Sequence, residues 1–168
     1  EVATLKNLVN EFAQLARFPG ARPVPSDINA VIQNALSVFN GRLDGIRVQL
    51  ELCPDLPPVN LDPEQFKRVI VNLVDNAAEA MENSLVRELH ISTADLRGEA
   101  VEVVVADTGH GVTSELKEKL FLPYFSTKRR GTGLGLAIVS RIISEHNGSI
   151  RVEENRPVGA RFIMELPL

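Results

Sequence analysis

The sequence is poor in several residue types that define protein classes. It has one cysteine, no tryptophan and one tyrosine, and aromatic residues make up only 5% of its 168 residues. With Cys53 alone, neither an intrachain disulfide nor a cysteine-based metal cluster can form. No apolar run approaches the roughly 20 residues that a membrane-spanning helix needs, and no signal peptide is visible. These absences predict a reduced, cytoplasmic setting without membrane contact.

Positive charge is also scarce. The formal net charge of −4 argues against a general nucleic-acid binder, although residues 128–130 form a local basic run. What remains is an ordinary globular composition, with 44% hydrophobic and 24% charged residues in a length that suits one well-packed core. His90, His110 and His146 show no metal-ligand spacing, and no nucleophile-elbow pattern supports a Ser-His-Asp triad. We expect His146 to be a helix-end residue that interacts with the helix dipole rather than a catalyst.

The most informative stretch is residues 125–136, where a basic run precedes a Gly-x-Gly-x-Gly turn and an apolar helical pattern. Glycine lets the backbone approach a ligand closely, and a helix N-terminus presents unpaired N–H groups and a positive dipole end. This combination predicts a polyphosphate-binding loop. A P-loop is excluded because Gly-x4-Gly-Lys-Ser/Thr is absent, and a dinucleotide fingerprint would need glycine at Leu136. For the glycines alone, a flexible hinge that caps a helix is an equally good interpretation.

A second motif lies on a predicted helix that starts at Asp62-Pro63, where aspartate can cap and proline suits the first turn. Its apolar stripe, with a period of 3.6 residues, consists of Phe66, Val69, Ile70, Leu73, Val74, Ala77 and Met81. Asn72 and Asn76 lie one turn apart along one border of this stripe, although asparagine has low helix propensity. They are either surface residues or two amide oxygens directed toward Mg²⁺ or its waters. The phosphate-binding loop favours the second interpretation.

A third motif follows a predicted hairpin of strands 89–94 and 101–106, joined by a turn at Arg97-Gly98. The second strand leads directly into Asp107, Gly109 and Gly111. A carboxylate at a strand end can accept from a planar donor, such as the exocyclic amine of adenine, while the glycine backbone passes close to the ring. An ordinary Asp-x-Gly turn is the alternative interpretation.

The rest of the chain predicts further helices and strands. Residues 1–18 form a helix with a narrow, coiled-coil-like stripe at Leu5, Leu8, Phe12 and Leu15, which packs on a partner helix or on its own domain. An extended linker and a helix capped by Ser26 or Asp27 follow. We also expect a strand at 47–52 with one solvated face, a short lid helix at 113–120, a helix at 134–146, and strands at 149–153 and 160–166 with a turn at 155–159 between them.

Four motifs stand in one order, and together they resemble the catalytic ATP-binding domain of two-component sensor histidine kinases. Residues 72–77 resemble the N box, 107–111 the first glycine box, 121–125 the F box and 131–136 the second glycine box. Residues 9–19 and the Phe125-Ser126-Thr127-Lys128 run are similar to the NtrB/NtrY-like group. The resemblance implies the Bergerat ATP-binding fold, an α/β two-layer sandwich with a mixed sheet under about three helices.

The same resemblance implies roles at an ATP and Mg²⁺ site. Asp107 would accept a hydrogen bond from the adenine amine, and Asn76, with Asn72, would hold Mg²⁺. Asn76, Lys128 and Thr132 are the implied catalytic residues. The implied nucleotide-binding residues are Asn72, Asn76, Asp107, Gly109, Gly111, Val112, Phe121, Tyr124, Lys128, Gly131, Thr132, Gly133, Leu134, Gly135 and Leu136. Among these, Val112, Phe121 and Tyr124 would belong to a mobile lid.

The resemblance further divides the chain into three parts. Residues 1–20 would be a remnant of the second helix of the dimerisation and phosphotransfer domain, 21–25 a linker, and 26–168 the catalytic domain. The phosphoacceptor histidine is expected N-terminal to residue 1, so these residues would bind ATP without phosphorylating themselves. The whole protein, a homodimer, would phosphorylate its own histidine and pass the group to a response-regulator aspartate in a phosphorelay.

One departure from the family pattern stands at Ala160, where members commonly carry a threonine that helps fix the adenine. Two alternatives stay open. The chain could be another ATPase of the wider superfamily, which includes gyrase-type and chaperone ATPases, or a serine kinase of that superfamily. It could also be a non-catalytic nucleotide-sensing or dimerisation module.

Overall fold

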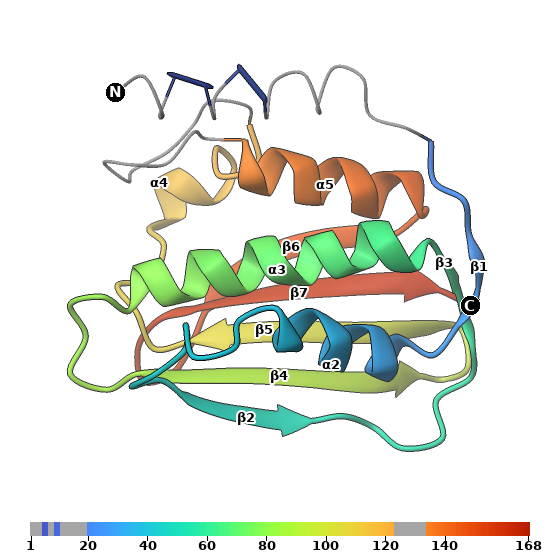
Figure 1. Ribbon diagram of the computed structural model, residues 1–168, viewed down its shortest axis with the longest axis horizontal. Helices are drawn as coiled ribbons and strands as arrows, with labels where there is room; N and C mark the ends of the chain where they lie inside the picture. The colour runs from blue at the N-terminus through green and yellow to red at the C-terminus, as the bar shows by residue number, and fades with distance from the viewer. Residues whose placement is uncertain (1–4, 7–8, 11–19, 123–133) are drawn as a thin grey trace.

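The structure, a computed structural model, describes residues 5–6, 9–10, 20–122 and 134–168. Helices cover one face of a five-stranded sheet, which makes a two-layer sandwich (Figure 1). The elements are β1 (Val24–Ser26), α2 (Ile28–Ser37), β2 (Arg47–Glu51), β3 (Val59–Leu61), α3 (Pro63–Ala80), β4 (Glu88–Leu96), β5 (Ala100–Asp107), α4 (Ser114–Lys117), α5 (Gly135–Glu145), β6 (Ser149–Glu154) and β7 (Ala160–Pro167). The sheet order is β2-β4-β5-β7-β6, parallel between β2 and β4 and antiparallel elsewhere. The predicted α/β sandwich with a mixed sheet under three helices is therefore confirmed.

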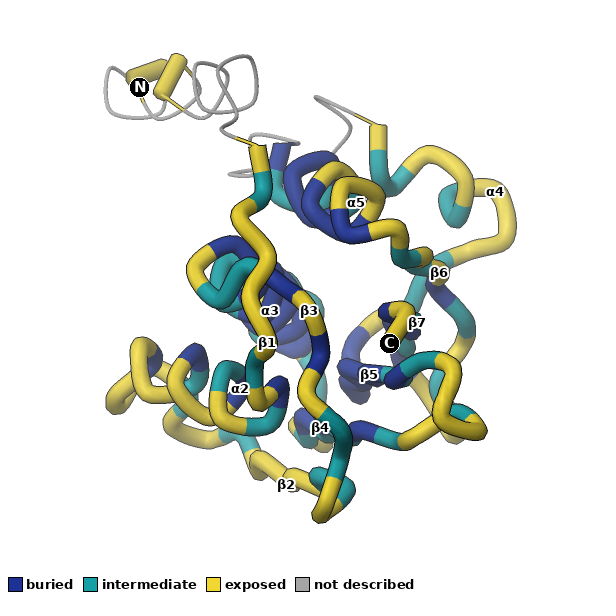
Figure 2. Tube along the Cα trace, turned by 90° about the vertical axis from the view of Figure 1, so that its right-hand side faces the viewer, coloured by how far each residue is buried: buried dark blue, intermediate teal, exposed yellow. Residues whose placement is uncertain are grey.

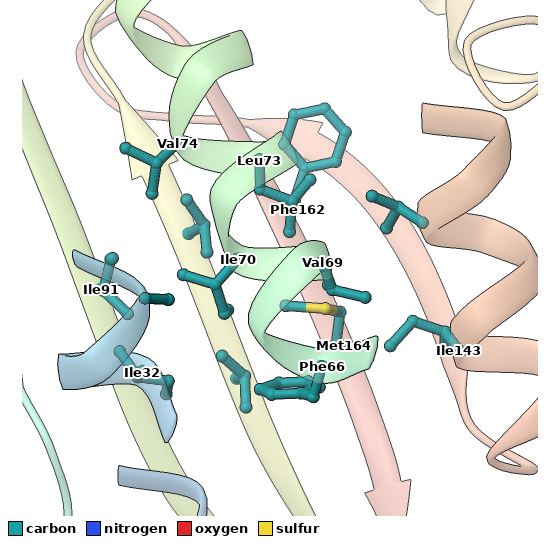
Figure 3. Close-up of a cluster of buried hydrophobic side chains, with 14 of the residues drawn as sticks. Ile32, Phe66, Val69, Ile70, Leu73, Val74, Ile91, Ile143, Phe162 and Met164 are labelled. Carbon is teal, nitrogen blue, oxygen red and sulfur yellow. The ribbon is translucent and has the colours of Figure 1, made fainter. Parts of the chain in front are cut away.

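Helix α3 forms the centre of the core. Its N-cap Asp62 accepts hydrogen bonds from the N–H groups of Glu64 and Gln65, and Pro63 occupies the first turn, as the sequence predicts. Its predicted apolar stripe is buried between the sheet and the flanking helices α2 and α5 (Figures 2 and 3). Figure 3 shows this contact through Phe66, Val69, Ile70, Leu73 and Val74 of α3, Ile32 of α2, Ile143 of α5, and Ile91, Phe162 and Met164 of the sheet.

The segment before α2 contains a strand that sequence reasoning missed. Residues 24 and 25, which the predicted division assigns to a linker, are extended and pair with Leu61 and Asn60 as part of β1. Asp27 caps α2 by accepting from the N–H groups of Asn29 and Ala30. Strands of three residues beside prolines carry no readable alternation, which is why neither β1 nor β3 was predicted.

Strand β2 forms at the predicted place, but its alternation does not produce a buried face. All of its residues are exposed, including Val48 at 38% and Leu50 at 40%. The physical reason is that β2 lies at the edge of the sheet. A neighbouring strand covers its side chains from one side, and the other side stays exposed.

The predicted N-terminal helix falls largely outside the described residues. Residues 5–6 and 9–10 are helical and exposed. Leu8, Phe12 and Leu15 of the predicted stripe lie outside the described residues. Within the part of the chain that the structure describes, no helix has both the length and the apolarity to cross a bilayer.

His146 connects the end of α5 to the start of α3. Its buried ring accepts a hydrogen bond at Nε2 from the N–H of Asp62 at 2.9 Å, and its Nδ1 lies 2.7 Å from the carbonyl oxygen of Ile142. Because Nε2 accepts from Asp62, Nδ1 is the ring nitrogen that can donate to Ile142, and both ring nitrogens have a partner. The sequence predicted only a helix-end residue that interacts with the dipole.

Replacing His146 with alanine is expected to lower the free energy of unfolding by about 1–3 kcal/mol, because the partly buried N–H of Asp62 loses its acceptor. Urea unfolding followed by circular dichroism would measure the loss. His110→Ala is the control, since His110 is exposed. An unchanged midpoint for His146→Ala would contradict the bridging role.

Candidate functional site

Asp107 is a buried carboxylate at the end of β5, with 2% of its surface exposed. Its Oδ1 accepts two backbone hydrogen bonds, from the N–H of Gly109 at 2.9 Å and from the N–H of Ala160 at 3.3 Å. Burial raises the pKa of Asp107, while these two hydrogen bonds and the nearby His110 partly oppose the rise. Both of these backbone donors meet Oδ1, so among the described residues Oδ2 is the carboxylate oxygen that they leave for another donor.

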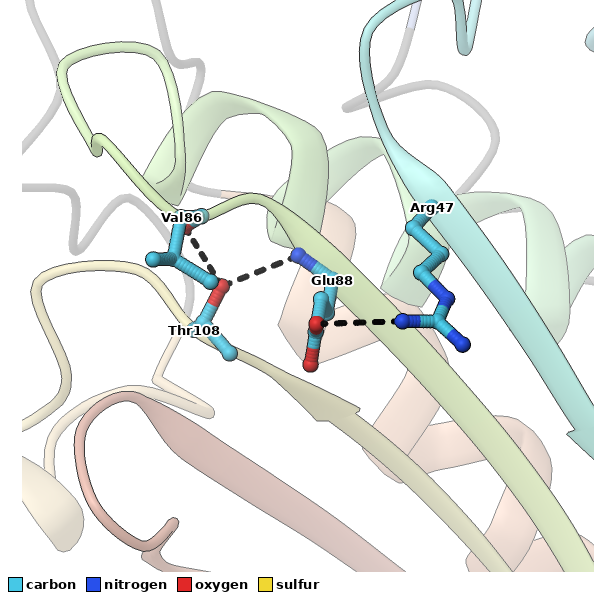
Figure 4. A network of polar contacts seen from close by, with 4 residues as sticks. All are labelled: Arg47, Val86, Glu88 and Thr108. Atoms are coloured by element: carbon cyan, nitrogen blue, oxygen red, sulfur yellow. Dashed lines mark hydrogen bonds and ion pairs between the residues drawn. The ribbon is translucent and has the colours of Figure 1, made fainter.

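Thr108 anchors the strand end that carries Asp107 (Figure 4). Its hydroxyl donates to the carbonyl oxygen of Val86 at 2.7 Å and accepts from the N–H of Glu88 at 3.0 Å. The carboxylate of Glu88 lies 3.9 Å from a guanidinium nitrogen of Arg47, which extends the network to β2. These contacts hold the end of β5 against the start of β4, so the position of Asp107 is set by two strands.

The loop that follows Asp107 contains Gly109 and Gly111 and packs on the C-terminal end of α3. The N–H of His110 donates to the carbonyl oxygen of Ala80 at 3.2 Å. A Cβ on Gly109 would overlap that oxygen and lie 2.6 Å from the carbonyl carbon, so only glycine fits there. The ring of His110 is exposed, with its Nδ1 2.7 Å from the carbonyl oxygen of Gly111.

The turn between β6 and β7 is a part of the site that sequence reasoning missed. Asn155 donates from its Nδ2 to the carbonyl oxygen of Asp107 at 2.7 Å, and Gly159 packs directly on the same peptide group. The sequence predicted a turn at these residues but no contact with Asp107. No local signal could have revealed it, because the contact joins residues 48 positions apart.

The asparagines of the N box lie on α3 between two other motifs. Asn72 donates from its Nδ2 to the carbonyl oxygen of Gly135 at 3.4 Å, which brings the first turn of α5 next to α3. Asn76 and Ala80 follow at one-turn intervals, and Ala80 contacts the loop after Asp107. From Asn72 to Ala80 the helix rises about 12 Å. Residues 134–136, the described part of the predicted second glycine box, therefore lie along the same helix, α3, as the predicted N box and first glycine box, toward the left in Figure 1.

Helix α5 begins beside this face without a polar N-cap side chain. Leu134 occupies the N-cap and is fully buried, and Leu136 is partly buried against the core. No described atom lies within 4 Å of a Cβ built on Gly135. The first-turn N–H groups and the positive dipole end thus face the region before residue 134, which the sequence assigns to phosphate binding.

Two of the three residues assigned to a lid can be placed. Val112 and Phe121 pack against the main core, and the ring of Phe121 meets that of Phe162 edge to face, with centroids 6.2 Å apart. The remaining predicted site residues, Tyr124, Lys128, Gly131, Thr132 and Gly133, lie outside the described residues.

Comparison with known proteins identifies the family. Residues 61–168 match the family model of histidine kinase-, DNA gyrase B-, and HSP90-like ATPases. The chain is 34% identical to the sensor histidine kinase ZraS of Klebsiella oxytoca, over all of this chain and 36% of ZraS. It thus spans about a third of the length of that curated relative.

Solved structures agree with this assignment. The crystal structure of full-length ShkA in complex with AMPPNP superposes with a TM-score of 0.85 at 28% identity, over 97% of this chain and 35% of ShkA. The catalytic domain of histidine kinase ThkA matches at 36% identity and a TM-score of 0.76, over 87% of this chain and 97% of that domain. ThkA in complex with the response regulator TrrA matches with a TM-score of 0.84 at 31% identity, over 99% of this chain and 48% of ThkA. The chain therefore belongs to the family of histidine kinase-, DNA gyrase B- and HSP90-like ATPases, and within it to the catalytic domains of sensor histidine kinases.

Proposed function

We propose that this chain binds ATP with Mg²⁺ and donates the γ-phosphoryl group to a histidine outside these residues. A response-regulator aspartate would then receive the group. The observation that carries the proposal is the convergence along α3 of the buried carboxylate of Asp107, the two asparagines of the N box and the start of α5. The span of about 12 Å between the two ends suits a nucleotide whose base lies at Asp107 and whose phosphates lie at α5.

Each end of this arrangement matches one part of the nucleotide. At Asp107, Oδ2 would accept a hydrogen bond from the adenine amine, while Oδ1 stays bonded to the backbone. Asn155 and Thr108 keep the carboxylate in position through the main chain around it. At the other end, the N-terminus of α5 favours negative charge. The solved structure of ShkA contains AMPPNP, which is an ATP analogue, and this supports the assignment.

The asparagines supply ligands of the type that Mg²⁺ accepts. The amide nitrogen of Asn72 donates to the carbonyl oxygen of Gly135, so its amide oxygen, Oδ1, is directed away from that contact. Hard cations bind amide oxygens, and Oδ1 would therefore suit Mg²⁺. Mg²⁺, when bound, would neutralise charge on the triphosphate during transfer. Asn76, Lys128 and Thr132 would position and neutralise the phosphates, and the backbone of residues 131–135 would donate to them.

The partners are proposed from the same family evidence. Residues 1–20 would belong to a dimerisation helix, 21–25 to a linker and 26–168 to the catalytic domain, with β1 pairing the end of the linker to β3. The ThkA complex with TrrA supports a response regulator as the acceptor. Similarity to ZraS supports an NtrB/NtrY-like kinase.

None of the three histidines suits the role of phosphoacceptor. His146 is buried and bonded through both ring nitrogens, and His90 lies on the sheet 3.2 Å from a carboxylate oxygen of Glu51. His110 lies in the glycine loop itself. The chain alone is therefore expected to bind ATP without labelling itself, and ³²P on any of these histidines would contradict the proposal.

Titration calorimetry with AMPPNP, with and without Mg²⁺, tests the proposal on wild type and Asn76→Ala. We expect Mg²⁺-dependent binding that weakens about 10- to 100-fold in the variant, because an inner or water-mediated ligand of the cation is lost. Asn34→Ala makes the same chemical change on the exposed face of α2 and should bind normally. Equal affinity of Asn76→Ala and wild type would refute the cation site, and no binding by either would refute the nucleotide site.

A further inference from the structure

Strand β2 leaves one edge of the sheet open. In the described part of the chain β4 is its only neighbour, and all five residues of β2 are exposed. Figure 1 shows β2 at the lower border of the sheet, away from α5 and the candidate nucleotide site. An edge strand presents unpaired N–H and C=O groups to any further strand that can match them.

The register with β4 shows which backbone groups face outward. The N–H of Arg47 donates to the carbonyl oxygen of Arg87 at 2.9 Å, so Arg47 points its backbone groups toward β4. Because backbone direction alternates along a strand, Gln49 and Glu51 point the same way. The N–H and C=O groups of Val48 and Leu50 therefore point toward the open edge.

We propose that the open edge of β2 binds β2 of a second copy of this chain, antiparallel, about a two-fold axis at Gln49. In this register Val48 lies opposite Leu50 of the second copy, and Leu50 opposite its Val48. These are the residues whose backbone groups point outward, so each pair can exchange both N–H···O=C bonds. The register thus uses every outward backbone group of the two residues.

The side chains match in the same register. Arg47 lies opposite Glu51 of the second copy, and the two-fold axis repeats this pair of opposite charges. Both lie on the sheet face of Glu88 and Ser92, while Val48 and Leu50 lie on the helix-covered face beside Leu89 and Ile91. Pairing would cover apolar side chains that are 38% and 40% exposed. One register therefore satisfies backbone, charge and apolar surface together.

The opposite edge of the sheet offers no such match. Its strand, β6, carries Arg151 and Glu153, which lie 3.1 Å apart, just as Arg47 and Glu51 of β2 lie near Glu88 and His90, so the difference between the edges lies in the residues that a second copy would face. An antiparallel self-pairing that sets Arg151 against Glu153 would also set the apolar Ile150 against the charged Glu154. Self-association through β6 is thus disfavoured, and β2 is the edge to test.

Sedimentation equilibrium over a concentration series tests the proposal with the chain as it stands. A five-residue strand makes a small interface, so we expect a weak dimer with a Kd of about 0.1–1 mM. Arg47→Glu and Glu51→Arg should each weaken association by about tenfold or more, because like charges then face each other. An equimolar mixture of the two variants, and the double variant, should restore it. Circular dichroism would verify that each variant folds.

Amide hydrogen exchange locates the contact. As concentration rises, the N–H groups of Val48 and Leu50 should become protected, while that of Gln49, already bonded to β4, should not change. Val48→Pro removes an outward donor without touching the β2–β4 ladder and should prevent association. A wild type that stays monomeric throughout the series, single variants that associate as tightly as wild type, or a mixture that fails to recover would each overturn the proposal.

Discussion

Replacing Asp107 with asparagine is expected to weaken AMPPNP binding by about 10- to 100-fold, as measured by calorimetry at neutral pH. Oδ1 of Asp107 accepts from two backbone N–H groups, so the amide oxygen of asparagine must take that place. The amide nitrogen then stands where, in the proposed site, Oδ2 would meet the adenine amine, and two donors would face each other. Turning the amide over would set its N–H₂ against two backbone N–H groups instead, at a similar energetic cost.

The control for this variant is Asp27→Asn. Asp27 also accepts two backbone hydrogen bonds, but it does so at the N-cap of α2, where asparagine caps as well as aspartate. We expect its nucleotide affinity to equal that of wild type. Unchanged affinity of Asp107→Asn would mean that the adenine binds elsewhere, and the assignment of both ends of the site would fail.

The pH dependence supplies an independent check on Asp107. Because burial raises its pKa, the folded state binds the proton more tightly than the unfolded chain does. This group's contribution to the free energy of unfolding therefore falls as pH rises from the unfolded to the folded pKa. At neutral pH, Asp107→Asn should then lose affinity without losing stability. When the pH is lowered, Asp107 of the wild type should take up a proton at a pH above 3.8, the ordinary pKa of an aspartate. Its nucleotide affinity should therefore begin to fall before pH 3.8 is reached.

The parts of the fold that the sequence predicted are those that local patterns determine. Helix α3 shows its N-cap and its 3.6-residue period in the sequence, and both are confirmed. The turn at Arg97-Gly98 also forms as predicted, with positive φ at both residues. In each case the determining residues lie within a few positions of one another.

What the sequence could not predict depends on contacts between distant segments. The sequence predicts only a turn at Asn155, yet the side chain of this residue donates a hydrogen bond to the carbonyl oxygen of Asp107. In the sequence Thr108 is an ordinary residue of a glycine-rich turn. In the structure its hydroxyl bonds to Val86 and Glu88 and so connects the end of β5 to the start of β4. The motif resemblance located the carboxylate, but only the structure shows which of its oxygens is already bonded.

Gly159→Ala is expected to lower the free energy of unfolding by more than about 4 kcal/mol, which is beyond the usual range for one substitution. Gly159 has φ of +110°, a conformation that side chains rarely adopt. A Cβ there would also overlap the carbonyl oxygen of Asp107 and lie 2.7 Å from its carbonyl carbon. The turn would have to leave the Asp107 peptide, which Asn155 also contacts.

Two other glycines separate the causes of this loss. Gly45 has φ of +84° with open space around it, so Gly45→Ala should show the strain alone, about 1 kcal/mol. Gly109 lacks a positive φ, but a Cβ would lie 2.6 Å from the carbonyl carbon of Ala80, so Gly109→Ala should show the clash alone. Urea unfolding of the three variants measures each term. If Gly159→Ala lost no more stability than Gly45→Ala, the turn between β6 and β7 would not be packed against Asp107, and the positioning of the carboxylate by this turn would be wrong.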